Sequence, residues 1–181
     1  MLSVFVIPSL DGSEVGSEIL VDGDEAHHAI KVVRLAIGEE INLTDGRGKW
    51  VRASVKSIEK KCFTASILES GIETLNKPEL VVIQAMTKSD RAKEAIELLV
   101  VGGVNRIIPW SSERTLAKWQ DDSSEKWMSA ILTASKQSRR FRFPELSAPM
   151  TTAEIVGEFG ADLIVLHESA PERLSTIDLA G

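Results

Sequence analysis

The sequence predicts an α/β protein in which a small N-terminal β-barrel domain is followed by a second domain with a parallel sheet. Residues 1–72 contain short stretches that alternate apolar and polar side chains between turn residues, which is typical of a small barrel. Further along, continuous apolar stretches alternate with helical patterns, which favours buried parallel strands joined by helices. Residues 69–79 hold few large apolar side chains, so we place the boundary there, with the second domain at residues 78–181.

The first domain is expected to hold one helix among its strands. Residues 4–7 (VFVI) form an apolar run that predicts a strand, and residues 24–35 carry apolar side chains at helical spacing. Gly38 ends this helix. Residues 41–58 form two alternating runs around an Asp-Gly turn, and residues 62–69 predict a further strand.

The second domain is expected to begin with a strand, a helix and a strand. Residues 80–86 are a continuous apolar run, and so is most of the run at residues 104–110. Between them, residues 87–103 have apolar side chains on one helical face and glycines at the end. This order predicts a crossover unit with two parallel strands.

Two more helices and a last strand are predicted beyond a polar connection. Asp122 and Glu125 stand at capping-box spacing before a helical pattern, and Thr151 with Glu154 begins another short helix. Residues 161–168 (ADLIVLHE) are mostly apolar and predict a last buried strand. Alternation of this kind predicts a sheet covered by helices on both faces.

Positive charge is concentrated in two blocks of an otherwise acidic chain. The net charge of the 181 residues is −6, but residues 27–61 hold eight bases against four acids. Residues 86–143 hold eleven bases against seven acids. Two such blocks are what a phosphate-binding face on a soluble protein requires. The alternative is that both are solvated faces without a ligand.

Several other classes of protein find no support in the sequence. No stretch resembles a signal peptide or a membrane span. The single Cys62 cannot form an internal disulfide, which favours a reduced, cytoplasmic protein. His27 and His28 are adjacent rather than on one helical face, so we expect no metal site. Phosphate-binding loops and hydrolase nucleophile motifs are absent as well.

Four local patterns stand out together and fall in the two basic blocks. Two of them follow predicted strands, and in open parallel sheets ligands bind beyond the carboxyl ends of strands. The patterns are HHAIKVVRLAIGEEINLTDGRG with His28 and Arg34, IQAMTKSDRAKEAIELLVVGGV with Lys88, Asp90 and Arg91, IIPWSSERT with Ser112, Glu113 and Arg114, and SKQSRRFRFP with Gln137, Arg139 and Arg140.

In order and spacing these patterns resemble the RsmE family of the SPOUT superfamily over nearly the whole chain. Members methylate N3 of a uridine in 16S ribosomal RNA of the small subunit and use S-adenosylmethionine as cofactor. The resemblance implies an N-terminal PUA-like RNA-binding barrel, to which His28, Val32, Arg34, Asp45 and Gly46 match. It also implies a SPOUT-type α/β domain with a C-terminal trefoil knot, and a cytoplasmic homodimer.

Two departures from the family pattern alter these expectations. Members read T-E-L-G-V where this chain has residues 100–104, so Val101 replaces a glutamate of the site. The family's G-P-E-G-G loop and L-R-T-E-T-A segment, which form the cofactor pocket, have no counterpart before Gly181. We therefore expect the 181-residue chain to bind S-adenosylmethionine poorly and to be inactive alone. The alternative function is a non-catalytic RNA-binding protein with a degenerate or truncated methyltransferase domain.

The reaction implied by the resemblance suggests the catalytic residues. The imide proton of uracil must leave, and a cation near the uracil oxygens favours the resulting anion. We expect Arg91, Arg114 and Arg140 to serve there, with Glu113 as a proton acceptor or as the ion-pair partner of Arg114. Replacing Arg140 by alanine in a complete protein is then expected to abolish methylation and leave the fold intact.

The remaining candidates are assigned to RNA and cofactor. RNA contacts are expected from His28, Arg34, Lys88, Gln137 and Arg139. A core or capping role is the alternative for His28, and interaction with the helix dipole is the alternative for Arg139. By position alone, the cofactor is expected near His167 and Glu168, which follow the last predicted strand. A small-molecule enzyme with an accessory barrel is a third reading, and it predicts weak RNA affinity that does not respond to salt.

Overall fold

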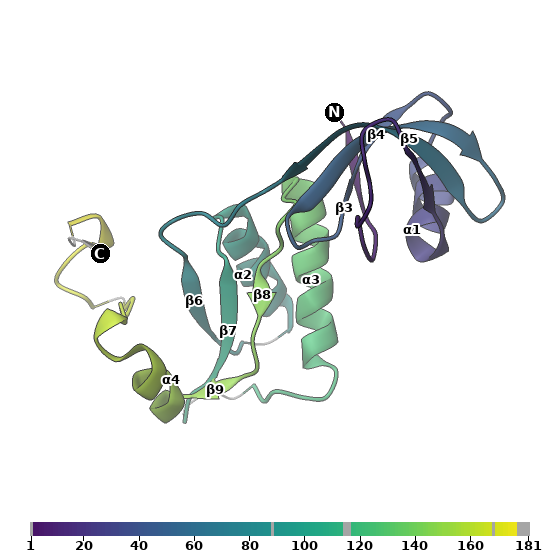
Figure 1. The fold of residues 1–181 in the computed structure, drawn as a ribbon. Helices are drawn as coiled ribbons and strands as arrows, with labels where there is room; N and C mark the ends of the chain where they lie inside the picture. Colours follow the sequence, from purple (N-terminus) through teal and green to yellow (C-terminus); the bar gives the residue numbers. More distant parts are fainter. Residues whose placement is uncertain (1, 88, 114–116, 168, 177–181) are drawn as a thin grey trace.

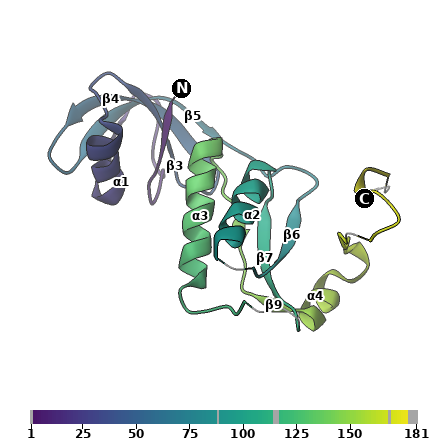
Figure 2. The ribbon, with the colours of Figure 1, turned by 180° about the vertical axis from the view of Figure 1, so that it is seen from behind.

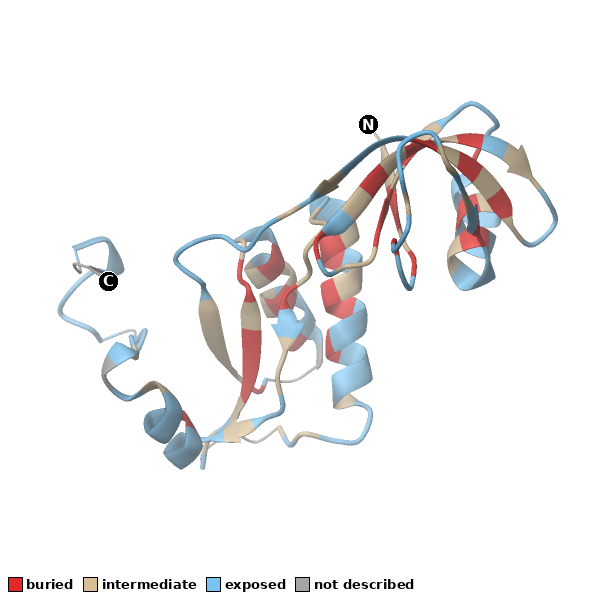
Figure 3. Ribbon diagram, viewed as in Figure 1, coloured by how far each residue is buried: buried red, intermediate tan, exposed pale blue. Residues whose placement is uncertain are grey.

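Two sheets of different kinds build the protein, and each has its own apolar core. The computed structural model describes residues 2–87, 89–113, 117–167 and 169–176. Figure 1 shows the N-terminal sheet beside the end of helix α3 and the second sheet beside helices α2 and α3. Seen from behind, α2 and α3 lie in front of the second sheet (Figure 2). Figure 3 shows buried positions concentrated in these two regions, while the C-terminal segment is largely exposed.

The N-terminal sheet has five strands in the order β1-β3-β4-β5-β2 and curls into a half-barrel. β1 pairs with β3 in parallel, and the other pairs are antiparallel. Alternate residues of β4 are buried, because successive side chains of a strand point to opposite faces. The strands are β1 (Ser3–Val6), β2 (Glu18–Val21), β3 (Glu40–Thr44), β4 (Lys49–Ile58) and β5 (Phe63–Ile72). The predicted barrel strands are thus confirmed, and β2 was not predicted.

The predicted helix at residues 24–35 is present in two parts. α1 (Gly23–His28) continues into a π-helix, η1 (Ala29–Val33), in which the turn widens. Val33 belongs to the apolar side chains at helical spacing in residues 24–35, but 37% of its surface is exposed. Leu35 is buried instead, and its N–H donates to the carbonyl of Ala29 at 3.0 Å. The extra residue per turn therefore shifts which side chains reach the core.

The second sheet is parallel, as predicted, with β7 at its centre. β6 pairs with one edge of β7, and β8 and then β9 pair with its other edge. Ile107 and Ile108 are neighbours on β7 and point to opposite faces, yet neither is exposed. The elements are β6 (Val81–Ala85), α2 (Ser89–Val101), β7 (Arg106–Ser111), α3 (Ser123–Ser138), β8 (Glu145–Leu146), β9 (Met150–Thr151) and α4 (Thr152–Phe159).

The core of the second unit lies between α2, α3 and one face of this sheet. Ile96 of α2, Ile131 of α3 and Ile107 of β7 are among its fully buried members. Trp127 packs edge-on against Trp119 with ring centroids 5.4 Å apart. Both views place α2 and α3 on the same side of the sheet, while α4 lies beside β9. The helices expected on both faces are therefore found together on one.

The strand predicted at residues 161–168 is wrong for the residues that the structure describes. A short 3-10 helix, η2 (Gly160–Asp162), is followed by extended chain without strand pairing, and a second one, η3 (Leu174–Thr176), lies further on. Val165 and Leu166 are 70% and 75% exposed. An apolar run becomes a strand only where another edge pairs with it, and no described strand pairs with these residues, although β6 stands at the edge of its sheet. The predicted boundary between residues 72 and 78 stays a prediction.

The two units meet where the turn after β3 contacts the chain that follows α3. The N–H of Gly48 donates to the carbonyl of Phe141 at 3.0 Å, and the N–H of Phe143 donates to the carbonyl of Gly46 at 2.8 Å. The rings of Trp50 and Phe141 stack with centroids 5.1 Å apart. These backbone bonds attach the segment after α3 to the N-terminal sheet.

Gly46→Ala is expected to destabilise the protein by about 1 to 3 kcal/mol, a cost set by backbone strain and overpacking. Gly46 has φ +71°, and a Cβ built there would lie 2.9 Å from the ring of Phe143. Urea denaturation measures the change. Gly12→Ala is the matched control, because Gly12 has φ +73° but open space around it. Equal losses in the two variants would show that contact with Phe143 adds nothing.

Candidate functional site

The carboxyl ends of β6 and β7 meet at one edge of the second sheet. The strands are in register from Val81 opposite Arg106 to Ala85 opposite Trp110, and the N–H of Met86 still donates to the carbonyl of Trp110 at 3.2 Å. Arg91 follows this edge in the first turn of α2, and Glu113 follows β7. Both are exposed. The structure thus brings these two predicted catalytic residues to the same edge, while Arg114 and Lys88 lie outside the described residues.

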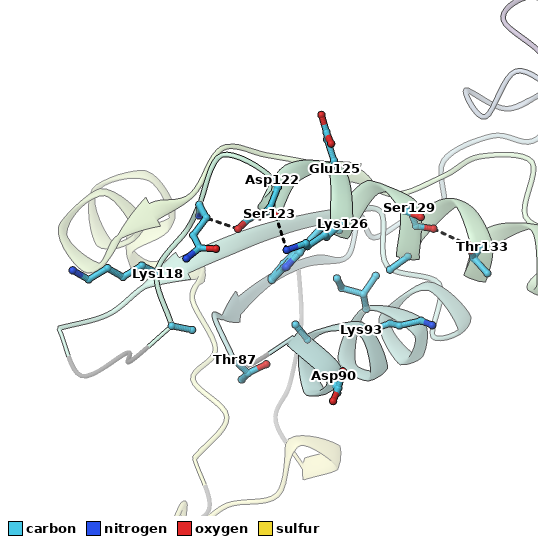
Figure 4. A pocket seen from close by; sticks show the side chains of 16 residues that line it. Thr87, Asp90, Lys93, Lys118, Asp122, Ser123, Glu125, Lys126, Ser129 and Thr133 are labelled. Atoms are coloured by element: carbon cyan, nitrogen blue, oxygen red, sulfur yellow. Dashed lines mark hydrogen bonds and ion pairs between the residues drawn. The ribbon is translucent and has the colours of Figure 1, made fainter.

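A cleft of about 870 Å³ opens beside this edge, between the first turns of α2 and α3. Figure 4 shows Thr87, Asp90 and Lys93 on one side and Lys126 on the other. Lys126 Nζ lies 2.6 Å from a carboxylate oxygen of Asp122. The lining mixes acids, bases and apolar side chains, and neither Arg91 nor Glu113 belongs to it. The cleft can admit a polar ligand, but its charges are partly neutralised within the protein.

The edge also receives the start of α4. Trp110 Nε1 donates to Thr152 Oγ1 at 3.1 Å, which ties β7 to the first residue of the helix. Thr151 and Glu154, predicted to begin a helix, do so and form a capping box. The capping box suggested by the spacing of Asp122 and Glu125 is wrong, because the Asp122 side chain makes no cap hydrogen bond and its backbone is already helical. Hydrogen bonds from the backbone and side chain of Thr151 lower the pKa of Glu154. The carboxylate therefore remains charged at the helix N-terminus, where the dipole favours it.

Arg140 lies at the opposite end of α2. Its Nη1 donates to the carbonyls of Val100 and Val104 at 3.0 and 2.9 Å. The side chain is partly buried, and this burial lowers the pKa of its guanidinium. Along α2, Arg91 and Val100 are about 14 Å apart at the usual rise per residue. Within one chain, Arg140 is therefore not brought together with Arg91 and Glu113, and it closes the end of α2.

The two units contact each other at the last turn of α3, and Phe5 of the first unit links His28 to Lys136 of the second. Lys136 pairs with Glu25 of α1 at 2.9 Å, and its Nζ lies 5.8 Å from the centre of the Phe5 ring. The imidazole of His28 packs against the same Phe5, with ring centroids 6.4 Å apart. Gln137 follows Lys136 directly and is exposed. The two basic blocks of the sequence thus meet at this junction.

Arg34 and Arg139 share an unusual backbone conformation. Their φ angles are +60° and +58°, and they are the two non-glycine residues with positive φ in the described chain. Each ends a helix, η1 or α3, at the position where glycine is usual. Both side chains are exposed, and neither guanidinium has a hydrogen-bond or ion-pair partner among the described residues. Strain of this kind is often retained where the side chain has a function.

His167 lies away from the residues at the sheet edge and from those at the junction between the two units. Its Nδ1 accepts from the N–H of Ser169 at 3.1 Å. With Ile164, Leu166 and Pro171 it lines a hollow of about 500 Å³ that belongs to the C-terminal segment alone. That segment stands apart from the sheet in both views (Figures 1 and 2). The other predicted cofactor residue, Glu168, lies outside the described residues.

Neither a metal centre nor a membrane span is found in the part of the chain that the structure describes. No three His, Cys, Asp or Glu side chains there are grouped so that they could hold an ion. None of its helices combines the length and the apolar character that crossing a bilayer requires.

Sequence reasoning missed the Glu25–Lys136 pair. Its members are 111 residues apart, and although Lys136 stands in the pattern SKQSRRFRFP, Glu25 stands in none of the four patterns. The concentration of bases in both blocks was the only signal that pointed toward this junction.

Family models define the class of protein. An RNA methyltransferase PUA domain matches residues 21–68, and an RNA methyltransferase domain matches residues 74–180. Ribosomal RNA small subunit methyltransferase E of Mycobacterium tuberculosis and that of Mycobacterium bovis are each 34% identical over 93% of this chain and 67% of the relative. The chain therefore belongs to the RsmE family of RNA methyltransferases. It spans about two thirds of the length of these two curated relatives.

Solved structures show the same fold. A ribosomal RNA small subunit methyltransferase E from Neisseria gonorrhoeae, bound to S-adenosylmethionine, matches with a TM-score of 0.82 and 23% identity over 98% of this chain and 75% of that chain. A predicted RNA methyltransferase from Thermotoga maritima matches with a TM-score of 0.63 and 29% identity, covering 83% of this chain and 66% of that one. The half-barrel followed by a SPOUT-type α/β domain is confirmed.

Proposed function

We propose that the complete protein methylates N3 of a uridine in 16S ribosomal RNA, with S-adenosylmethionine as the methyl donor. Membership of the RsmE family along nearly the whole chain carries this proposal. Donor-bound relatives of the same fold support the choice of cofactor. We further propose the predicted cytoplasmic location and homodimer.

The described residues do not form a site that fits the methyl donor. The hollow at His167 is made by one exposed segment, and neither lysine nor arginine is among the described residues that line it. We therefore derive no step through the donor, and we expect the 181-residue chain to be inactive by itself. For this chain taken alone, RNA binding without catalysis is the second candidate function, and the separation of Arg140 from Arg91 favours it.

The residues at the sheet edge fit the handling of uracil. Arg91 is exposed there and keeps its five donors for the uracil oxygens, where positive charge favours the N3 anion. Glu113 lies beyond the neighbouring strand and accepts the imide proton, directly or through water. Methyl transfer is otherwise a matter of position, because the nitrogen must approach the methyl group in line with sulfur.

The junction between the two units fits RNA backbone. Arg34 and Arg139 present free guanidinium groups, whose planar forks match phosphate oxygens. His28 and Gln137 can add hydrogen bonds to phosphate or sugar. Because the contributing residues come from both halves of the chain, one RNA can touch both.

RNA affinity is expected to fall about tenfold or more when salt is raised fourfold, because bound phosphates release counterions. Fluorescence anisotropy with a single-stranded RNA measures this slope. Replacing Arg34 and Arg139 together by glutamine is expected to make the slope shallower by about 1.4, which is 0.7 for each lost phosphate contact. A flat response in the unmodified protein would instead support the small-molecule reading.

Methylation itself is tested on small ribosomal subunits from cells that lack the gene. The complete protein should transfer label from S-adenosylmethionine to 16S ribosomal RNA, and mapping the product should place the methyl group on N3 of a uridine. Label on another base would refute the proposed reaction. So would the absence of label in the RNA when the protein is shown to bind S-adenosylmethionine.

A further inference from the structure

Glu73 lies at the centre of the junction between the two units. Its Oε2 accepts hydrogen bonds from the backbone N–H groups of Phe141 at 2.6 Å and Arg142 at 3.1 Å. Arg142 Nε donates in return to the carbonyl of Glu73 at 3.0 Å. Hydrogen bonds that involve a charged group are roughly twice as strong as neutral ones. One residue of the connecting segment thus holds two successive residues of the chain after α3.

Gly48 completes this arrangement. Its carbonyl accepts from the N–H of Glu73 at 2.8 Å, while its own N–H donates to Phe141. A Cβ at Gly48 would lie 2.5 Å from both the Glu73 carbonyl and Arg142 Nη2, so only glycine fits there. We call the set Gly48, Glu73, Phe141 and Arg142 the latch. It joins the N-terminal sheet, the connecting segment and the chain after α3 at one point.

A second attachment lies nearby, at the last turn of α3. Both carboxylate oxygens of Glu25 lie 2.9 Å from Lys136 Nζ, and Oε2 also accepts from the N–H of Val6 at 3.2 Å. The two side chains are only 21% and 23% exposed, so water screens the pair less than a surface pair. A single attachment would leave the units free to rotate about it. The latch and this pair, together with the hydrogen bond from Phe143 to Gly46, fix their orientation.

We propose that the latch holds the RNA-contacting residues of the two units as one rigid surface, which binds a single RNA segment that spans both. His28 and Arg34 belong to the N-terminal unit, and Arg139 ends α3 of the second unit. Glu73 is a positioning residue, because it contacts backbone groups and not the RNA. This inference rests on the RNA binding proposed above and adds the requirement that both units act on one strand.

A rigid latch favours RNA binding through the contact that the second unit makes after the first unit has bound the RNA. Once one unit holds the RNA, the other meets it at an effective concentration set by the link between them. A rigid link in the bound geometry avoids the entropy cost of ordering the units at each binding event. A short RNA that touches one unit gains nothing from this rigidity, whereas a longer RNA does. The dependence of affinity on RNA length therefore reports on the latch.

The experiment measures affinity for single-stranded oligouridylates of increasing length at one salt concentration. With the unmodified protein, affinity should rise sharply once the RNA reaches both units. In Glu73→Ala the affinity for the longest RNA should fall about tenfold, because part of the effective concentration is lost. Affinity for the shortest RNA should stay within about twofold, since each unit alone keeps its contacts. Glu73→Gln keeps an oxygen acceptor and should restore part of the length dependence.

Glu79→Ala is the charge-matched control. Glu79 lies on the same connecting segment, is exposed and has no side-chain partner among the described residues. Gly48→Ala disturbs the latch without changing charge, so it should show the same loss of affinity for the longest RNA as Glu73→Ala. It therefore also tests the inference if Glu73→Ala folds poorly. Identical length dependence in the latch variants and in Glu79→Ala would overturn the inference. Absence of RNA binding by the unmodified protein would instead refute the proposed function.

Discussion

Arg140→Ala is expected to lower the free energy of unfolding by about 2 to 3 kcal/mol, the usual cost of losing hydrogen bonds to a charged group. Nη1 of Arg140 holds the carbonyls of Val100 and Val104, which lie at the end of α2 and before β7. The Val100 carbonyl keeps a hydrogen bond from the N–H of Gly103 at 3.1 Å, but Val100 and Val104 are both buried, so water replaces the guanidinium poorly. Urea denaturation followed by circular dichroism measures the loss.

Arg139→Ala is the neighbouring control, because Arg139 is exposed and makes no such bonds. Arg140→Lys should recover only part of the stability, since one ammonium cannot reproduce the guanidinium fork. The sequence alone led to a different expectation, namely lost methylation with an intact fold. If the alanine variant of the complete protein is as stable as the parent but inactive, the catalytic assignment of Arg140 stands and the structural one fails.

Most of the regular structure could be predicted, because local periodicity encodes it. Three predicted elements agree with the structure within a few residues. β6 corresponds to the apolar run at residues 80–86, α2 to the helix predicted within residues 87–103, and β7 to the run at residues 104–110. The switch from alternating to continuous apolar runs likewise indicated the change from a curled antiparallel sheet to a parallel one. These signals depend on which faces are buried, which the sequence displays directly.

The errors arise where tertiary pairing decides. β2 has four residues, and Leu20 within it is 60% exposed, so its alternation is too short to see. Residues 161–167 are apolar enough for a strand but pair with no strand in the described chain. The π-helix of η1 depends on Leu35 reaching the core, which no spacing rule anticipates.

The candidate site was predicted in part for a similar reason. Position after a strand correctly placed Arg91 and Glu113 at one edge, because parallel strands end together. It could not reveal that a whole helix separates Arg91 from the partners of Arg140. Nor could it find Glu73, one of three glutamates in the segment assigned to the boundary, since its role depends on Phe141 and Arg142 far along the chain. Roles that depend on distant partners are not encoded locally.

Arg34→Gly and Arg139→Gly are expected to stabilise the protein and weaken RNA binding at the same time. A left-handed backbone costs a non-glycine residue about 1 to 2 kcal/mol, which glycine avoids. Glycine also raises the conformational entropy of the unfolded chain, which offsets part of this stabilisation. The free energy of unfolding should therefore rise by about 0.5 to 1 kcal/mol per site. Each lost phosphate contact should reduce RNA affinity about tenfold, the value of one charge-assisted hydrogen bond.

Alanine at the same positions separates the two effects. Arg34→Ala and Arg139→Ala remove the charge but keep the backbone strain, so they should weaken RNA binding as much as glycine does without raising stability. Thermal unfolding and RNA titration on the same preparations give both quantities. If glycine and alanine variants are equally stable, the strain inferred from the φ angles of +60° and +58° has no energetic weight. If stability rises while RNA affinity is unchanged, these arginines do not contact RNA, and the retained strain needs another cause.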